Sequence, residues 1–222
     1  MPTQTFFNLP EAKRQTIVKL AIAQFASHDY KIASISNIVK QAKIAKGSFY
    51  QYFEDKKDLY LYLVDLAHQQ KIDFLQQAKP PGLEMGFFPY LRWLFRESAQ
   101  FDLSHPALSQ IINRAVYGDV PFRDEVLKRT QSVSLMYVHG LVKQGIDRGD
   151  IDPGIDPDFA AFVISALADG LRDFIPGRLS LNSEQLTEAG VPELDMQVVE
   201  QVFDDLIGVL EHGMGRSSDT KL

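Results

Sequence analysis

Residues 33–53 read ASISNIVKQAKIAKGSFYQYF, and this pattern predicts two short helices joined by a tight turn. Ser34 or Ser36 can begin the first helix, because a serine hydroxyl accepts a hydrogen bond from the free N–H groups of a first turn. Apolar residues at helical spacing then give this helix one buried face. They are Ile35, Ile38, Val39 and Ala42.

The second helix is expected to begin near Lys46 and to end near Phe53. Phe49 and Phe53 are four residues apart, so they share one face and can pack inward. The outer faces then carry Lys46, Gly47, Ser48, Tyr50, Gln51 and Tyr52. Cations, hydroxyls and amides suit base edges and phosphates. We therefore predict a helix-turn-helix that binds DNA; a helical pair with no DNA role would not need this outward set.

A longer motif surrounds the two helices. It runs Ile38-Val39-x-x-Ala42-x-Ile44-Ala45-Lys46-Gly47-Ser48-Phe49-Tyr50-x-Tyr52-Phe53-x-Asp55-Lys56-x-x-Leu59. This motif resembles the signature of the TetR family of bacterial transcriptional regulators. It departs from the family where the turn usually holds glycine (here Lys43) and often serine (here Ala45). A lysine in a left-handed turn costs roughly 1 kcal/mol relative to glycine, and Ala45 lacks a hydroxyl for a cap or phosphate contact.

The resemblance also implies which residues meet DNA. The positions that reach phosphates or the groove edge match Ser34, Ser36, Tyr50, Tyr52 and Lys56. The positions near base edges match Lys46, Gly47, Ser48 and Gln51.

Composition limits the remaining possibilities. The 222 residues are 45% hydrophobic, enough for one or two domains with a substantial core. The formal net charge is −6, but residues 1–60 hold 9 basic and 5 acidic residues, so the basic part coincides with the predicted DNA-binding helices. The absence of cysteine fits a reducing cytoplasm. No apolar run is long enough to span a membrane, so we expect a cytoplasmic protein with no membrane partner.

The whole chain reads as helical, which predicts an all-α protein with two domains. Residues 8–55 are expected to form the DNA-binding domain and residues 56–215 a helical domain for ligand binding and dimerisation. A helix over 56–78 links the two, and residues 216–222 are expected to be a disordered tail. Further helices are predicted over residues 10–29, 87–101, 106–118, 124–148, 158–174 and 196–214.

The helices over 158–174 and 196–214 carry broad apolar stripes. These could be ordinary core, or they could form a four-helix bundle between two subunits. Because TetR regulators dimerise through their last two helices, the resemblance implies a homodimer. The expected interface comprises Phe159, Phe162, Val163, Leu167, Gly170, Val199, Val202, Phe203, Leu206 and Leu210.

Aromatic residues are abundant after residue 70, either as packing or as the lining of a cavity for a small molecule. The candidate ligand contacts are Trp93, Arg96, Asn113, Tyr117, Tyr137, His139 and Arg172. The sequence has no recognisable catalytic or metal motif, so we expect no enzyme, metal or cofactor. The resulting prediction is a dimeric repressor released from a palindromic double-stranded DNA operator by a hydrophobic or amphipathic effector. The alternatives are an activator, a co-repressor-dependent regulator or, more remotely, a carrier or enzyme.

Overall fold

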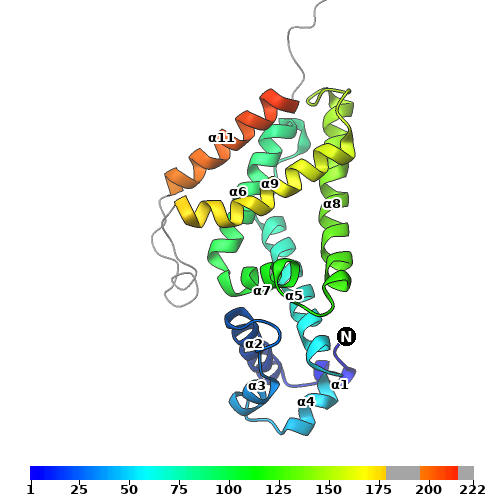
Figure 1. Ribbon diagram of the computed structural model, residues 1–222, viewed down its shortest axis with the longest axis vertical. Helices are drawn as coiled ribbons and strands as arrows, with labels where there is room; N and C mark the ends of the chain where they lie inside the picture. Colours follow the sequence, from blue (N-terminus) through cyan, green and yellow to red (C-terminus); the bar gives the residue numbers. More distant parts are fainter. Residues whose placement is uncertain (179–195, 215–222) are drawn as a thin grey trace, which may run out of the picture. The chain divides into compact units, whose positions relative to one another are not determined.

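The prediction of an all-α chain is confirmed. The computed structural model describes residues 1–178 and 196–214, except for the side chains at positions 83, 130–134, 172, 173, 176 and 196. These ranges form α-helices and one short 3₁₀ helix, with no β-strand among them (Figure 1). None of the described helices is both long and apolar enough to cross a membrane. The predicted tail at 216–222 lies outside the described residues.

The observed helices agree closely with those predicted from periodicity. Their bounds are α1 (Gln4–Phe7), α2 (Glu11–Ser27), α3 (Ile35–Gln41), α4 (Lys46–Tyr52), α5 (Lys56–Gln77), η1 (Leu83–Met85), α6 (Phe87–Ser104), α7 (Pro106–Tyr117), α8 (Arg123–Arg148), α9 (Pro157–Arg178) and α11 (Met196–Met214). Helix α1 was not predicted, because four residues are too few to show a helical period.

The chain divides by packing into two compact units, and the first combines residues 1–73 with 105–128. Its core contains four of the residues predicted to face inward, Ile38, Val39, Phe49 and Phe53, together with Ile17, Ala21 and Phe25 of α2. Helix α7 adds Ile111 and Ala115 to the same core. The predicted domains, residues 8–55 and 56–215, are defined by function rather than by packing, so that division stays a prediction.

Helix α1 packs against the end of α4. Phe6 is fully buried, with its ring centroid 4.8 Å from that of Phe53 and 6.2 Å from that of Tyr52. The Thr3 N–H donates to the Tyr52 carbonyl at 2.9 Å, and the Thr3 hydroxyl donates to the Gln51 carbonyl at 2.6 Å. The last carbonyls of a helix have no partner within it. Residues before α2 therefore complete the C-terminal end of α4.

Helix α5 begins with two aspartates that satisfy backbone N–H groups. The Asp55 carboxylate accepts from the Asp58 N–H at 2.7 Å, and the Asp58 carboxylate accepts from the Glu54 N–H at 3.1 Å. This arrangement resembles a capping box made with aspartate, except that the second N–H belongs to Glu54 rather than to the N-cap residue. Asp58 is only 8% exposed and also pairs with the Met1 amino group. The start of α5 is therefore tightly fixed.

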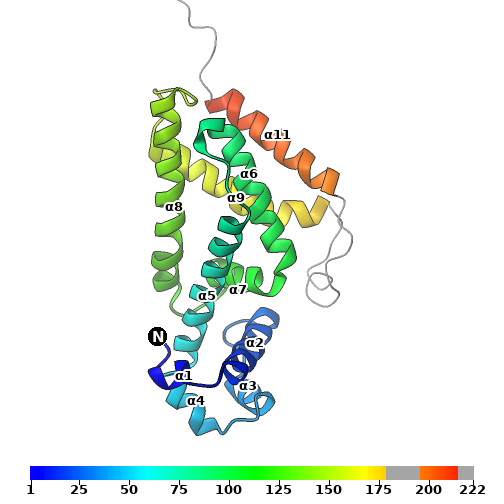
Figure 2. The same ribbon diagram turned by 180° about the vertical axis from the view of Figure 1, so that it is seen from behind.

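The second unit contains residues 74–104 and the described residues from 129 onward. In Figures 1 and 2, α11 lies alongside α6 and α9. The packing among these helices contributes to the core of the second unit. Buried side chains come from α6, the second half of α8, α9 and α11; they include Phe87, Leu91, Val142, Ile164 and Phe203. Asp150 caps α6 by accepting from the Phe87 N–H at 2.9 Å.

Candidate nucleic-acid interface

Helix α3 is fixed at its first turn by two hydrogen bonds. The Ser34 hydroxyl accepts from the Asn37 N–H at 3.3 Å, so Ser34 is the N-cap. The Asn37 amide donates to Gln24 on α2 at 2.7 Å, and Gln24 is only 9% exposed. Gln24 and Asn37 were not singled out from the sequence, since their partnership depends on how α2 and α3 meet. Ser36 stays exposed on the outer side of α3.

The turn between α3 and α4 has the conformation that the sequence implied. Lys43 adopts a left-handed backbone with φ of 53°, where a glycine would be less strained. The Ile44 N–H donates to the Val39 carbonyl at 3.1 Å and closes the turn. Ala45 precedes α4 and makes no side-chain cap, as expected from the missing hydroxyl.

Helix α4 has a polar face that is exposed to solvent and an opposite face whose aromatic side chains are buried. Lys46, Tyr50 and Gln51 are exposed, and Ser48 is half-buried. Gly47 is exposed, and a Cβ built there would meet no atom within 4 Å. The protein's own packing therefore does not require glycine at this position, and the free space lies on the face predicted to contact DNA.

The placement of Tyr52 on that outer face is wrong. Its side chain is 5% exposed and contributes to the first core. The reason is α1, whose Phe6 packs against this side of α4. Because α1 is too short to show a helical period, the sequence pattern could not indicate that this side of α4 is covered. A phosphate contact by the Tyr52 hydroxyl stays an untested prediction.

Lys56 is the first residue of α5 and is half-buried. Its Nζ lies 4.7 Å from the centroid of the Tyr30 ring and donates to the Lys31 carbonyl at 3.2 Å. Burial lowers the pKa of this ammonium. The following residue, Lys57, pairs instead with Glu125 at 2.6 Å. The two lysines that begin α5 therefore differ in their partners.

The expected dimer face is divided between exposed and buried residues. On α9, Phe159 and Phe162 are 64% and 61% exposed, and Gly170 is exposed as well. Val163 and Leu167 are half-buried against the second core. On α11, Leu206 is also half-buried, whereas Val199, Val202, Phe203 and Leu210 lie within the subunit's own core.

These four buried residues correct the α11 side of the expected interface. They are 0–8% exposed, because they face α6 and α9 of the same chain. Among the described side chains of α11, Val209 is apolar and 69% exposed. Periodicity had identified the apolar stripe of α11 correctly but could not say which chain covers it.

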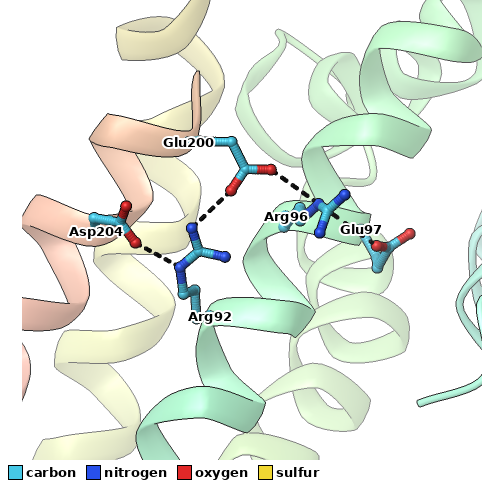
Figure 3. A network of polar contacts seen from close by, with 5 residues as sticks. All are labelled: Arg92, Arg96, Glu97, Glu200 and Asp204. Carbon is cyan, nitrogen blue, oxygen red and sulfur yellow. Dashed lines mark hydrogen bonds and ion pairs between the residues drawn. The ribbon is translucent and has the colours of Figure 1, made fainter. Parts of the chain in front are cut away.

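Charged side chains join α6 to α11, as Figure 3 shows. Arg92 donates from Nε to Asp204 at 2.6 Å and from Nη2 to Glu200 at 2.7 Å. The hydrogen bond to Asp204 is the main reason that the pKa of Arg92 is raised. Arg96 lies 3.0 Å from Glu200 and 4.0 Å from Glu97. Arg96, an expected ligand contact, is therefore already paired with carboxylates.

The other expected ligand contacts do not gather at one site within either unit. Asn113 and Tyr117 belong to the first unit, whereas Trp93, Arg96, Tyr137 and His139 belong to the second. The Tyr137 hydroxyl is 2.6 Å from that of Tyr90, whose ring centroid is 5.5 Å from that of Trp93. Burial and the bond to Tyr90 raise the pKa of Tyr137. His139 Nε2 lies 3.3 Å from Asp158, and the Arg172 side chain lies outside the described residues.

Two of the hollows on the described surface are lined by other residues. One, of about 420 Å³, lies between α2 and α5 over Val18, Ile22, Tyr62 and Leu66. The other, of about 380 Å³, lies beside Met85, Phe88 and Glu211. None of the expected ligand contacts whose side chains are described lines either hollow, so the position of a ligand site stays a prediction.

Comparison with known proteins identifies relatives along nearly the whole chain. Residues 17–63 match the bacterial regulatory proteins of the tetR family, and residues 85–215 match the tetracyclin repressor-like C-terminal domain. A solved TetR family transcriptional regulator from Chloroflexus aurantiacus is 43% identical, with a TM-score of 0.82, over 98% of this chain and 100% of its own.

Two further relatives concern fatty acids by name or ligand. The fatty acid metabolism regulator protein of Bacillus subtilis is 26% identical over 163 residues, which cover 71% of this chain and 80% of that protein. A solved structure of FadR from Bacillus subtilis in complex with stearoyl-CoA has a TM-score of 0.63 at 18% identity. It covers 80% of this chain and 97% of its own, and it shows a shared fold.

Regulators of this family bind operator DNA and small-molecule ligands and are dimeric. The matching relatives and domains are transcriptional regulators rather than enzymes. In helix-turn-helix proteins the second helix of the pair lies in the major groove, and α4 is the second helix of this pair. With 43% identity to a TetR regulator over almost the full length and two matching family domains, the chain is a DNA-binding transcriptional regulator and belongs to the TetR family.

Proposed function

We propose that the protein is a homodimeric repressor that binds a pseudo-palindromic operator in the cytoplasm and is released by a hydrophobic or amphipathic ligand. The observation that carries the DNA part is the outer face of α4, where Lys46, Gly47, Tyr50 and Gln51 are exposed. In this proposal Lys46, Gly47, Ser48 and Gln51 lie near base edges. The phosphates are met by Ser34, Ser36, Tyr50 and Lys56.

The dimer rests on the exposed side of α9. Phe159 and Phe162 are each more than half exposed, and their ring centroids are 6.4 Å apart; adjoining exposed aromatic residues are typical of a subunit contact. A Cβ built at Gly170 would meet nothing within 4 Å of the same chain, which leaves room for a close partner helix. A two-fold dimer places two α4 helices in successive major grooves, roughly 34–36 Å apart.

Selection of bound genomic fragments tests the DNA part. We expect the purified protein to enrich fragments that share a two-fold symmetric site, and one dimer to occupy that site in analytical ultracentrifugation. A matched duplex with one half-site scrambled is the control. Binding that ignores sequence, or that is equally strong on the scrambled duplex, would contradict the proposal.

The ligand class rests on chemistry and on likeness. The second unit is rich in buried aromatic and aliphatic side chains, and a protein of the same fold was solved with stearoyl-CoA. We expect stearoyl-CoA or stearic acid to release the protein from the selected operator, with free coenzyme A as the control. Reciprocity requires the operator to weaken ligand binding by the same factor. Equal ligand affinity with and without operator would contradict induction.

A further inference from the structure

The two lysines that begin α5 are held by different kinds of groups. Lys57 forms an ion pair with Glu125 at 2.6 Å, and its Nζ lies 5.1 Å from the centroid of the Phe122 ring. Lys56 contacts the face of Tyr30 and the carbonyl of Lys31. Among the residues that the structure describes, no carboxylate lies within ion-pair distance of Lys56. Lys57 is thus neutralised within the protein, whereas Lys56 is held by uncharged groups.

The ring beneath Lys56 is fixed by aromatic neighbours from three parts of the first unit. Tyr30 stacks on Phe25 of α2, with centroids 6.2 Å apart and planes inclined by 15°. It meets Tyr60 of α5 edge-on at 5.2 Å and Phe122, which precedes α8, at 4.9 Å. Tyr60 is only 1% exposed. The Tyr30 ring therefore has a defined orientation before any DNA binds.

This arrangement orders a flexible side chain while keeping its charge. A lysine side chain has four rotatable carbon–carbon bonds, and ordering it on binding costs affinity. A π face attracts an ammonium and a carbonyl accepts from it, yet neither removes its charge. Burial lowers the pKa of this group, so an anion nearby would favour its charged form. A DNA phosphate is such an anion.

We propose that Tyr30 is a positioning residue for DNA binding, whose ring holds the Lys56 ammonium ready to meet a backbone phosphate. The inference rests on the proposed phosphate contact of Lys56 and adds the group that orients it. A phosphate contact carries no sequence information. Loss of the Tyr30 ring is therefore expected to weaken operator and random DNA alike.

A double-mutant cycle in the full-length protein tests the inference. Tyr30→Leu removes the aromatic face, Tyr30→Phe keeps it, and each is made with Lys56 and with Lys56→Ala. We expect Tyr30→Leu to weaken binding to both DNAs about fourfold to twentyfold, with two subunits contributing. Tyr30→Phe should stay within about twofold of the parent. In the Lys56→Ala background, Tyr30→Leu should change affinity less than about twofold.

The salt dependence of binding separates positioning from general packing. Lys56→Ala should reduce the slope of log K against log salt by about two for a dimer, and Tyr30→Leu should reduce it by a smaller amount. The matched control is Lys57→Gln with Glu125→Gln, which replaces the neighbouring neutral pair without changing net charge. We expect this control to leave the slope unchanged, because Lys57 is already neutralised.

Three results would overturn the inference in distinguishable ways. Equal losses from Tyr30→Leu with and without Lys56 would show that Tyr30 acts through packing alone. Equal losses from Tyr30→Phe and Tyr30→Leu would exclude the ring face. An unchanged affinity and salt slope in Lys56→Ala would contradict the proposed phosphate contact of Lys56. The proposed function would still hold in that case if the parent protein binds its operator. Thermal unfolding monitors the fold, and Tyr30→Met replaces Tyr30→Leu if the latter does not fold.

Discussion

Helices α4 and α9 each leave one face outside their own core, and the two faces have opposite chemistry. The outer face of α4 carries Lys46, Tyr50 and Gln51, groups that water can solvate. The outer face of α9 carries Phe159 and Phe162, which water solvates poorly. A polar face such as that of α4 is stable in water and can bind a partner reversibly, whereas an aromatic face such as that of α9 favours a permanent partner. We therefore expect dimerisation to persist while DNA binding is reversible.

Phe162→Glu is expected to have the largest effect on this contrast. An isologous interface contains the residue twice, and hot-spot aromatic residues contribute about 2 kcal/mol or more each. The dimer dissociation constant should rise at least about a hundredfold, as measured by sedimentation equilibrium, with helical content retained. Phe203→Ala is the contrasting variant, because Phe203 is fully buried and its loss should cost about 3–5 kcal/mol of folding stability. A Phe162→Glu protein that stays dimeric at low micromolar concentration would place the interface elsewhere.

Gln51→Ala tests the polar face of α4. Its amide can pair with the two major-groove groups of adenine, so removal should cost roughly 1–3 kcal/mol on the operator and much less on random DNA. Lys46→Ala, on the same exposed face, is measured beside it to find which residue reads the base. If both variants bind the operator as tightly as the parent, α4 does not lie in the groove as proposed.

Arg92→Ala sharpens the comparison within the second unit, where ion pairs between α6 and α11 add to the apolar packing of α11. Arg92 bonds Asp204 and Glu200, but it is about one-third exposed. Solvent therefore screens the pairs, and the loss of folding stability should be about 1 kcal/mol or less. Urea denaturation at low salt and at 1 M salt measures it, and the difference should shrink at high salt. A salt-independent loss would mean that the Arg92 stem contributes mainly by packing.

Lys43→Gly is expected to have the smallest effect. Lys43 has φ of 53°, so glycine relieves strain at the turn before α4 while adding freedom to the unfolded chain. The net gain in folding stability should be about 0.5–1 kcal/mol, read from thermal unfolding, with no change in the operator sequence preferred. Lys79→Gly, with the same φ after α5, is the matched variant away from DNA. A destabilised Lys43→Gly would show that the lysine side chain itself supports the turn.

The local features of the DNA-binding helices could be predicted because their signals are local. The cap at Ser34, the turn at Lys43 and the inward pair Phe49 and Phe53 each depend on residues within one or two helical turns. Tyr52 could not be placed, because its cover comes from Phe6, 46 positions earlier in the chain. Tyr30 was missed for the same reason, since its neighbours come from α2, α5 and the segment before α8.

The two apolar helices of the second unit show where periodicity stops being informative. Val202 and Val209 both lie on the broad apolar side of α11, yet Val202 is 8% exposed and Val209 is 69% exposed. What separates them is the position of α6, which no pattern within α11 records. The candidate ligand contacts are divided between the two units for a similar reason, because residues 105–128 pack with the first unit; whether they form one site stays a prediction.

The first unit is built from two separate stretches of the chain, residues 1–73 and 105–128, and this has a consequence for biosynthesis. Helix α7 and the start of α8 supply Ile111, Ala115 and Val126 to the same core as Ile17 and Phe25. Domains generally fold as units while the chain emerges from the ribosome. The DNA-binding helices therefore cannot complete their core until residue 128 has left the exit tunnel, by which time the helix α6 that intervenes is also outside. Nascent chains stalled before that point should lack a finished operator-binding head, which limits premature capture of DNA during translation.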